Sequence, residues 1–150
     1  MEYRTFNKND TESLRNMIIK VAVEDFNHDD VWLKYYQELD FSCFENSKNK
    51  LYIILNDNNP VCCGGYKILD DAKAELCLFY TLKSYQGKKL NSKIYDMVLK
   101  DLKSLNIKHL NLISNLDFKD AIKMWQKRGF VEYERHFCSG SYDIKMKKEL

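Results

Sequence analysis

The chain has 150 residues, of which 45% are hydrophobic and 13% aromatic. This length favours a single domain over residues 1–150, and the composition can fill an ordinary core, which excludes a disordered protein. The net charge of +2 is too small for a dedicated nucleic-acid binder, for which we expect a clear basic excess.

The first quarter of the sequence reads as a strand followed by two helices. A short strand is expected at Tyr3–Phe6, and Asp10 or Thr11 is placed to cap the helix that follows it. A second helix is expected at Val31–Leu39, after an acidic break at Glu24–Asp30. The first helix carries apolar residues at the spacing of one helical face, namely Leu14, Met17, Ile18, Val21 and Ala22.

Three strand-like runs come next, and tight turns separate them. Leu51–Leu55, Val61–Leu69 and Glu75–Leu82 are rich in apolar, β-branched and aromatic residues. Turn-forming residues stand at 57–60 and at 70–73. We therefore expect an antiparallel meander in the middle of the chain.

The second half alternates between helices and strands. Asn106 is expected to end the first of these helices, Asp117 to cap the second, and Gly129 to follow its last turn. The whole order is β-α-α-β-β-β-α-β-α-β-β, which indicates a mixed α/β (α+β) fold. The expected elements are a helix, a strand, a helix and two strands, at Tyr85–Leu105, His109–Ser114, Asp117–Arg128, Val131–Cys138 and Tyr142–Met146.

The cysteines and the apolar segments indicate the environment of the protein. Five cysteines form no CxxC pair, and the three histidines stand at no ligand spacing from them, so we expect reduced, buried thiols and no metal. No segment fits a signal peptide or a membrane span. These patterns predict a cytoplasmic protein that is not inserted in a membrane.

The most informative stretch is a strand that runs into a turn and then opens a helix. The turn is Tyr85-Gln86-Gly87-Lys88. The first backbone N–H groups of a helix have no partner inside it and carry the positive end of its dipole, so they bind anions such as a pyrophosphate. On these residues alone, a solvated basic helix start remains the alternative.

The surrounding residues resemble the acetyl-CoA motif of the GNAT N-acetyltransferase family, commonly A-E-L-x-x-L-Y-V-x-P-x-Y-R-G-K-G-I-G-S. Downstream, Ala121-Ile122, Lys127-Arg128-Gly129-Phe130 and Tyr142–Met146 resemble later segments of the same family. Gln86 stands where the family has Arg or Gln. The motif positions that match are Ala74, Glu75, Leu76, Tyr80, Tyr85, Gly87, Lys88 and Ser92.

The resemblance implies both a fold and an activity. The fold is a GNAT-like acyl-CoA N-acyltransferase fold, with a central mixed, mostly antiparallel sheet of about seven strands flanked by about four helices. The activity is transfer of an acetyl group from acetyl-CoA to a primary amine by direct attack, with neither nucleic acid nor membrane as a partner. The family often dimerises through its last strands, so a homodimer stays open.

The resemblance also assigns cofactor-binding positions. Backbone groups of Tyr80, Thr81 and Leu82 are expected to bond the pantetheine arm and to polarise the acetyl carbonyl. Asn115 is the nearest match to an asparagine that precedes the family's last helix. The pyrophosphate is expected to lie on the loop formed by Gln86, Gly87, Lys88, Lys89, Leu90, Asn91 and Ser92.

Glu75 and Tyr80 are the candidate catalytic residues. Glu75 stands where some members have a glutamate that accepts the proton of the amine, and its alternative role is a strand residue facing solvent or a lysine. Trp125 replaces the tyrosine thought to protonate the leaving thiolate. An indole N–H is too weak an acid for that, so Tyr80 or Tyr133 would take over, or the thiolate leaves unaided.

Two departures and an acidic loop leave alternatives open. Lys89 and Asn91 replace the two glycines that begin the family's helix, which together with Trp125 favours a non-catalytic CoA-binding or regulatory module as the second hypothesis. A basic nucleic-acid-binding domain is the third. The break at Glu24–Asp30 is suited to attract a cationic amine or is simply solvated. His136, like His28 within that break, is a further candidate base.

Overall fold

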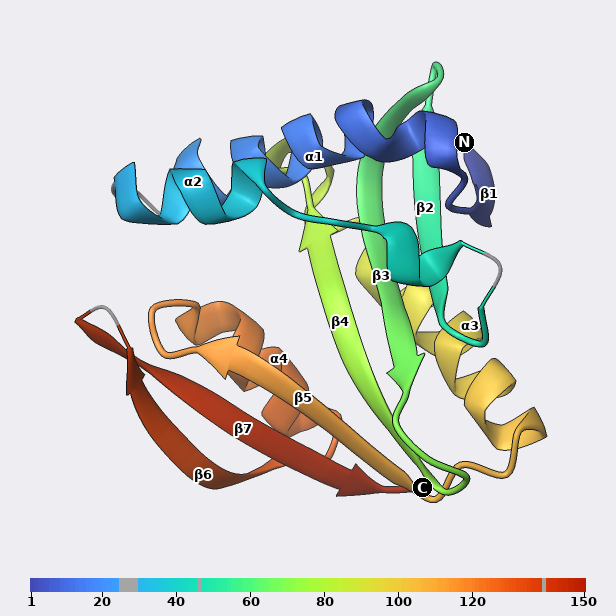
Figure 1. Cartoon of the computed structure of the whole chain (residues 1–150), viewed down its shortest axis with the longest axis vertical. Coiled ribbons are helices and arrows are strands. Elements are labelled where there is room, and N and C mark those ends of the chain that lie inside the picture. The colour runs from blue at the N-terminus through green and yellow to red at the C-terminus, as the bar shows by residue number, and fades with distance from the viewer. Residues whose placement is uncertain (25–29, 46, 139) are drawn as a thin grey trace.

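The computed structural model describes residues 1–24, 30–45, 47–138 and 140–150. The described helices and strands follow the order expected from the sequence (Figure 1). Asp25, His28 and Asp29 of the acidic break lie outside the described residues. The helices are α1 (Thr11–Ile19), α2 (Asp30–Gln37), α3 (Leu90–Ser104) and α4 (Lys119–Lys127), and the strands are β1 (Glu2–Thr5), β2 (Lys50–Asn56), β3 (Asn59–Ile68), β4 (Lys73–Thr81), β5 (His109–Asn115), β6 (Val131–Cys138) and β7 (Ser141–Glu149).

The strands of the described residues form one seven-stranded sheet in the order β1-β2-β3-β4-β5-β7-β6. Neighbouring strands run antiparallel, except that β4 and β5 pair in parallel. A parallel pair needs a crossover connection, and here α3 supplies it. The mixed, mostly antiparallel sheet with four α-helices in the described chain confirms the expected fold class.

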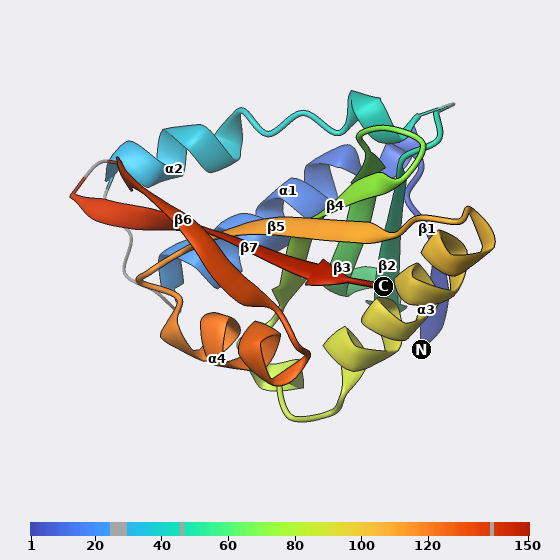
Figure 2. The ribbon, with the colours of Figure 1, turned by 90° about the horizontal axis from the view of Figure 1, so that it is seen from below.

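The helices cover both faces of the sheet, two on each side. Figure 2 shows α2 above the sheet and α3 and α4 below it, and α1 shares a core with α2. The larger core lies under α3 and α4, where Ile94, Leu102 and Leu110 are fully buried. The second core lies under α1 and α2 and includes Leu14 and Ile53. Strand residues therefore alternate between the two cores, as the period of a strand requires.

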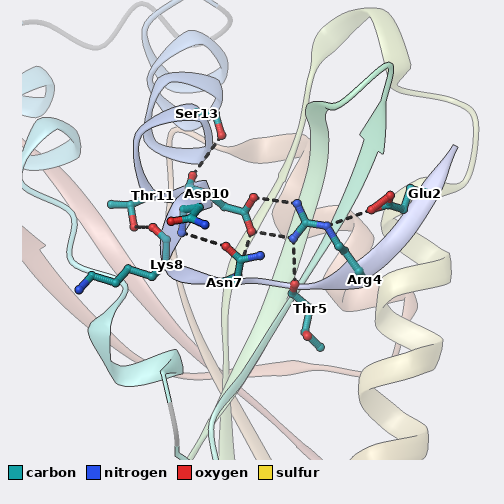
Figure 3. Close-up of polar contacts among 9 residues, drawn as sticks. Glu2, Arg4, Thr5, Asn7, Lys8, Asp10, Thr11 and Ser13 are labelled. Atoms are coloured by element: carbon teal, nitrogen blue, oxygen red, sulfur yellow. Dashed lines mark hydrogen bonds and ion pairs between the residues drawn. The ribbon is translucent and has the colours of Figure 1, made fainter.

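An ion pair fixes the start of α1 against the edge strand β1 (Figure 3). The guanidinium of Arg4 donates from Nη1 to Oδ2 of Asp10 at 2.7 Å and from Nη2 to Oδ1 at 2.8 Å. The Asn7 amide donates to the same carboxylate at 2.8 Å. Asp10 is the residue before α1, as expected, but its carboxylate bonds Arg4 and Asn7 rather than the first helical amides.

Backbone conformations explain how the chain turns between elements. Asp57 and Asn58 both have positive φ, which fits the tight turn between β2 and β3. Asn106 and Gly129 also have positive φ, and each ends its helix as the sequence predicted. After α4, the amides of Gly129 and Phe130 bond back to the carbonyls of the last helical turn.

The predicted start of α4 was wrong by two residues. Asp117 does not cap this helix, which begins at Lys119 after Phe118 without a side-chain cap. Instead, the amide of Asp117 donates to Oδ1 of Asn115 at 2.9 Å, so this asparagine closes a turn before the helix. Three short 3-10 segments, which the apolar pattern did not predict, connect other elements at Lys8–Asp10, Ser42–Phe44 and Lys83–Tyr85.

Candidate functional site

The central parallel strands are paired over a short stretch only. The register joins Lys73, Ala74 and Glu75 of β4 to β5, and the two strands then diverge toward the carboxyl end of β4 (Figure 1). A diverging pair leaves backbone groups on the facing edges without a strand partner. This opening is where the candidate site lies.

A bulge bends β4 just before the opening. Cys77 faces Gly65 across the sheet and Tyr80 faces Cys63, so Leu78 and Phe79 together oppose Gly64. Leu78 adopts φ of 59°, a conformation that non-glycine residues reach only with strain.

The strand opposite the bulge has a glycine where the strands approach closely. A Cβ added to Gly64 would lie 2.7 Å from ring carbons of Phe79. The sequence pattern of alternating apolar residues gave no sign of this bulge, because Leu78 is neither glycine nor asparagine.

A cleft of about 660 Å³ occupies the opening between β4, β5 and the first turn of α3. The size suits a ligand of a few hundred daltons. The predicted residues that line it are Tyr80, Thr81, Gln86, Gly87, Lys89, Leu90, Asn91, Ser92 and Asn115. The predicted residues outside the lining are Glu75, Leu82 and Lys88.

The end of β4 presents its backbone groups alternately to β3 and to the cleft. The amide of Leu82 donates to the carbonyl of Val61 at 2.9 Å, so it is not free for a ligand. Because alternate residues of a strand point opposite ways, the backbone of Thr81 faces the cleft instead. From that side, Nε2 of the Gln86 side chain donates to the Thr81 carbonyl at 3.4 Å. Backbone groups of Tyr80, Thr81 and Leu82 were all expected to be free for the pantetheine arm. By this alternation, Tyr80 and Leu82 face β3 and Thr81 faces the cleft.

The turn after β4 brings backbone amides to the edge of the cleft. Gly87 has φ of 81° and Lys89 has φ of 61°, so both are left-handed. Lys89 precedes the first residue of α3, and no side chain caps the helix there. The amides of the first turn, including those of Asn91 and Ser92, therefore have no acceptor within the helix, and they make an anion-binding edge.

Arg128, at the end of α4, reaches across to this edge. Its Nη1 donates to Oδ1 of Asn91 at 2.9 Å, and its Nη2 donates to Oγ of Ser92 at 3.1 Å. Its guanidinium carbon lies 4.4 Å from the ring centroid of Tyr95 and 5.0 Å from that of Trp125. Burial lowers the pKa of Arg128. In the sequence, Arg128 was noted only as part of the Lys127-Arg128-Gly129-Phe130 motif, and no role was predicted for it.

Tyr80 points to the opposite side of the sheet from α3 and α4. Its ring meets that of Tyr36 edge-on, with centroids 6.4 Å apart. The two hydroxyl groups are hydrogen-bonded, and burial raises the pKa of Tyr80 well above its usual range. The phenol is therefore a hydrogen-bond donor and not an acid that ionises near neutral pH.

Glu75 stands at the closed end of the opening. It faces Lys67 of β3 and Asn111 of β5 in the register, where β4 and β5 are still paired. The pKa of Lys145 is raised, first by its hydrogen bond to Glu134 and to a lesser degree by the charge of Glu75. Glu75 thus has a lysine near it, one of the two surroundings that the sequence allowed.

Trp125 is a core residue. It is 5% exposed, and its ring meets those of Phe79, Tyr95 and Phe130 edge-on at 5.2, 5.7 and 5.4 Å between centroids. These contacts fill the space between β4, α3 and α4. Trp125 therefore packs in the core on the inner face of α4.

Asn115 is buried, and its side chain joins the end of β5 to β7. Its Nδ2 donates to Oδ1 of Asp143 at 3.1 Å, and its Oδ1 accepts from Oγ of Ser141 at 3.1 Å as well as from the Asp117 amide. The side chain lines the cleft, but these bonds already hold it in place.

Two absences concern the described part of the chain. Residues 1–24, 30–45, 47–138 and 140–150 contain no group of three or more His, Cys, Asp or Glu side chains placed to hold a metal. None of the helices in those ranges has the length and apolar character needed to span a membrane.

Comparison with known proteins extends these observations. The sequence model of the family described as "Acetyltransferase (GNAT) family" matches residues 11–130. An acetyltransferase of the GNAT family from Staphylococcus aureus is similar in fold, with a TM-score of 0.81 and 21% identity over 99% of this chain and 98% of that chain. No curated protein sequence matches the chain.

Two further solved structures share the fold. The PaiA N-acetyltransferase from Thermoplasma acidophilum, solved in complex with coenzyme A, has a TM-score of 0.80 and 19% identity over 99% of this chain and 98% of that chain. The ribosomal-protein-alanine N-acetyltransferase from Brucella melitensis has a TM-score of 0.73 and 14% identity over 100% of both chains.

Proposed function

The chain belongs to the GNAT family of acetyltransferases, and we propose that it transfers an acetyl group from acetyl-CoA to a primary amine of a small molecule or a protein. The observation that carries this proposal is the cleft between the diverging strands β4 and β5, which meets the uncapped first turn of α3. Such a cleft offers one end to phosphate groups and the other to an extended arm.

The cleft residues fit acetyl-CoA in charge and in hydrogen bonding. Lys83, Lys89 and Arg128 line the cleft with a single carboxylate among its described residues, that of Asp120, so the lining is positive overall. The outward backbone of Thr81 is suited to bond the pantetheine arm and to polarise the acetyl carbonyl. These groups supply orientation and polarisation, while the thioester itself supplies the reactive acyl group.

A purified sample of the full chain tests the proposal directly. Thiol release from acetyl-CoA in the presence of a panel of amines is expected to exceed the amine-free background, and CoA is expected to raise the melting temperature. A clear thermal shift without turnover on any amine would favour the non-catalytic CoA-binding module that Trp125 suggests. The absence of both turnover and a thermal shift would falsify the proposal.

A matched pair of serine variants locates the binding. Ser92 lies in the first turn of α3 at the cleft, whereas Ser104 is the last residue of the same helix. A carboxylate introduced by S92E is expected to repel the phosphate groups and to abolish the thermal shift by CoA. S104E is expected to keep it. Equal effects of the two variants would place CoA elsewhere.

We propose that Glu75 accepts the proton of the amine through water from the closed end of the cleft. E75Q is expected to lower kcat at least about tenfold, with the KM for acetyl-CoA unchanged. Glu134, an exposed carboxylate paired with Lys145, gives the matched control E134Q. Activity of E75Q within twofold of wild type would place the base elsewhere.

We propose a supporting role for the Tyr80 hydroxyl as a hydrogen-bond donor near the reacting group. Y80F is expected to lower kcat about tenfold while leaving CoA binding unchanged, because the ring still packs on Tyr36. Y36F is the comparison, since it removes the partner of the same hydrogen bond. An unchanged kcat in Y80F would show that the Tyr80 hydroxyl takes no part in the transfer.

A further inference from the structure

Arg128 is a cation that the protein holds in one orientation at the edge of the cleft. Its guanidinium packs on the rings of Tyr95 and Trp125 and donates to the side-chain oxygens of Asn91 and Ser92. A guanidinium has five N–H donors, so these two bonds leave others available on the side of the cleft that it lines.

This guanidinium forms no ion pair in the described part of the chain, and the charge of Asp96 raises its pKa by less than burial lowers it. The ion pairs of the described residues involve other side chains, and none includes Arg128. Asp120, the carboxylate that lines the same cleft, stands eight residues away, or about 12 Å along α4. A partly buried charge without a directly paired carboxylate is costly unless a ligand supplies an anion.

An anionic ligand at this place is also within reach of the amides of α3. Asn91 and Ser92, the two acceptors of Arg128, belong to the uncapped first turn of that helix. The same anion can therefore accept hydrogen bonds from backbone amides on one side and from a guanidinium on the other. This pairing suits a phosphate group, which a guanidinium can bind with two parallel bonds.

We propose that Arg128 binds a phosphate group of CoA and that Asn91 positions it to do so. The inference rests on the proposed function, because it takes CoA as the ligand of the cleft. The proposal also explains the role of the Asn91 side chain, because a glycine at that position would have no oxygen to accept the hydrogen bond from Arg128.

The nearby lysines are less suited to this task. Lys88 lies over the ring of Tyr85, with Nζ 4.9 Å from the centroid, and does not line the cleft. Lys89 is exposed, so ordering its long side chain on a ligand costs entropy. Arg128 is already ordered by two rings and two hydrogen bonds, and it loses less freedom when a phosphate binds.

The test compares Arg128→Gln with Lys127→Gln, which removes the same charge from the exposed neighbouring residue of α4. Dissociation constants are measured for CoA, for dephospho-CoA, which lacks the 3′-phosphate, and for pantetheine, which lacks every phosphate. R128Q is expected to weaken CoA binding at least about tenfold and to leave pantetheine binding unchanged. K127Q is expected to stay within twofold of wild type for all three.

The three ligands identify the phosphate. A loss of affinity shared by CoA and dephospho-CoA assigns Arg128 to the pyrophosphate, and a loss confined to CoA assigns it to the 3′-phosphate. N91G is expected to show a smaller loss of the same pattern, since it removes the acceptor that orients Arg128. A normal affinity of R128Q for CoA, or an equal loss for pantetheine, overturns the proposal.

Two checks keep the test decisive. If R128Q does not fold, as thermal unfolding would show, R128K replaces it, because lysine keeps the charge and the aliphatic stem but lacks the fork. R128K is expected to weaken CoA binding at least about threefold, and no loss overturns the proposal. Absence of CoA binding by the wild-type chain would instead refute the proposed function itself.

Discussion

The ring of Phe79 stands edge-on to the ring of Trp125, with centroids 5.2 Å apart and an angle of 89° between the planes. Phe79 belongs to the bulge of β4, and Trp125 lies on α4, so this contact joins two elements that border the cleft. Trp125 thus serves as a packing residue between β4 and α4. It stands at the position where the family has a tyrosine that is thought to protonate the leaving thiolate.

Trp125→Phe is expected to lower the free energy of unfolding by about 1–3 kcal/mol, because a smaller ring leaves space among Phe79, Tyr95 and Phe130. The acetyl-transfer rate is expected to stay within about twofold of wild type, since no indole proton takes part. Denaturant titration and steady-state kinetics measure the two effects. A tenfold fall in kcat with unchanged stability would contradict the packing role.

Tyr95→Phe is expected to raise the free energy of unfolding by about 1 kcal/mol in the absence of ligand. The Tyr95 hydroxyl is buried and has no hydrogen-bond partner among the described residues, so removing it relieves an unsatisfied group. The ring contacts with Trp125 and Phe130 remain. Y52F is the comparison, because the Tyr52 hydroxyl donates to Asp101 and its loss is expected to destabilise. A destabilised Y95F would reveal a partner for this hydroxyl.

Asp10→Asn is expected to cost about 2–3 kcal/mol at pH 7, because it breaks the paired hydrogen bonds to Arg4. The hydrogen bond from Arg4 holds the pKa of Asp10 below its usual value. A depressed pKa stabilises the fold above the unfolded value near about 4, and that contribution is lost as pH falls through the folded pKa. The difference between D10N and wild type should therefore shrink on acidification.

Glu2→Gln serves as the control for that experiment, since Glu2 bonds the same arginine from an exposed position. Its effect is expected to stay below about 0.5 kcal/mol. A D10N penalty that does not change between pH 7 and pH 3 would show that the carboxylate charge contributes nothing.

Lys89→Gly is expected to stabilise the protein by about 0.5–1 kcal/mol, because Lys89 has φ of 61° and ψ of 22°, which glycine adopts without a Cβ penalty. Lys89→Ala removes the same charge but keeps the Cβ, so it should bring no such gain. Thermal unfolding of the two variants separates backbone strain from charge. Equal stability of K89G and K89A would show that the turn is unstrained.

The order of elements could be predicted from the sequence because each has a clear period or a strong terminus. Leu90, Ile94 and Val98 line one face of α3, and Asn106 and Gly129 adopt the positive φ that ends their helices. The turn that begins α3 could be found from its motif, because that arrangement is local in the chain.

The features that escaped the sequence depend on contacts between distant segments. The bulge at Leu78 arises from the fit of β4 to β3, with Phe79 against Gly64, and nothing in the residues of β4 announces it. The backbone groups of Thr81 face the cleft because, in the register of β3 with β4, only alternate residues of β4 direct their backbone groups away from β3. Arg128 reaches the site because the end of α4 lies next to the start of α3, where Arg128 bonds Ser92, 36 residues earlier in the chain.

The short parallel pairing of β4 with β5 has a consequence for how the chain folds. Hairpin turns join β2, β3 and β4, so their contacts are close in sequence and form after small loop closures. The β4–β5 pairing, by contrast, must bring Ala74 to Leu110 across the whole of α3. It forms only three paired positions in return for closing this longer loop. We expect the hairpins to form first and this junction to limit the folding rate.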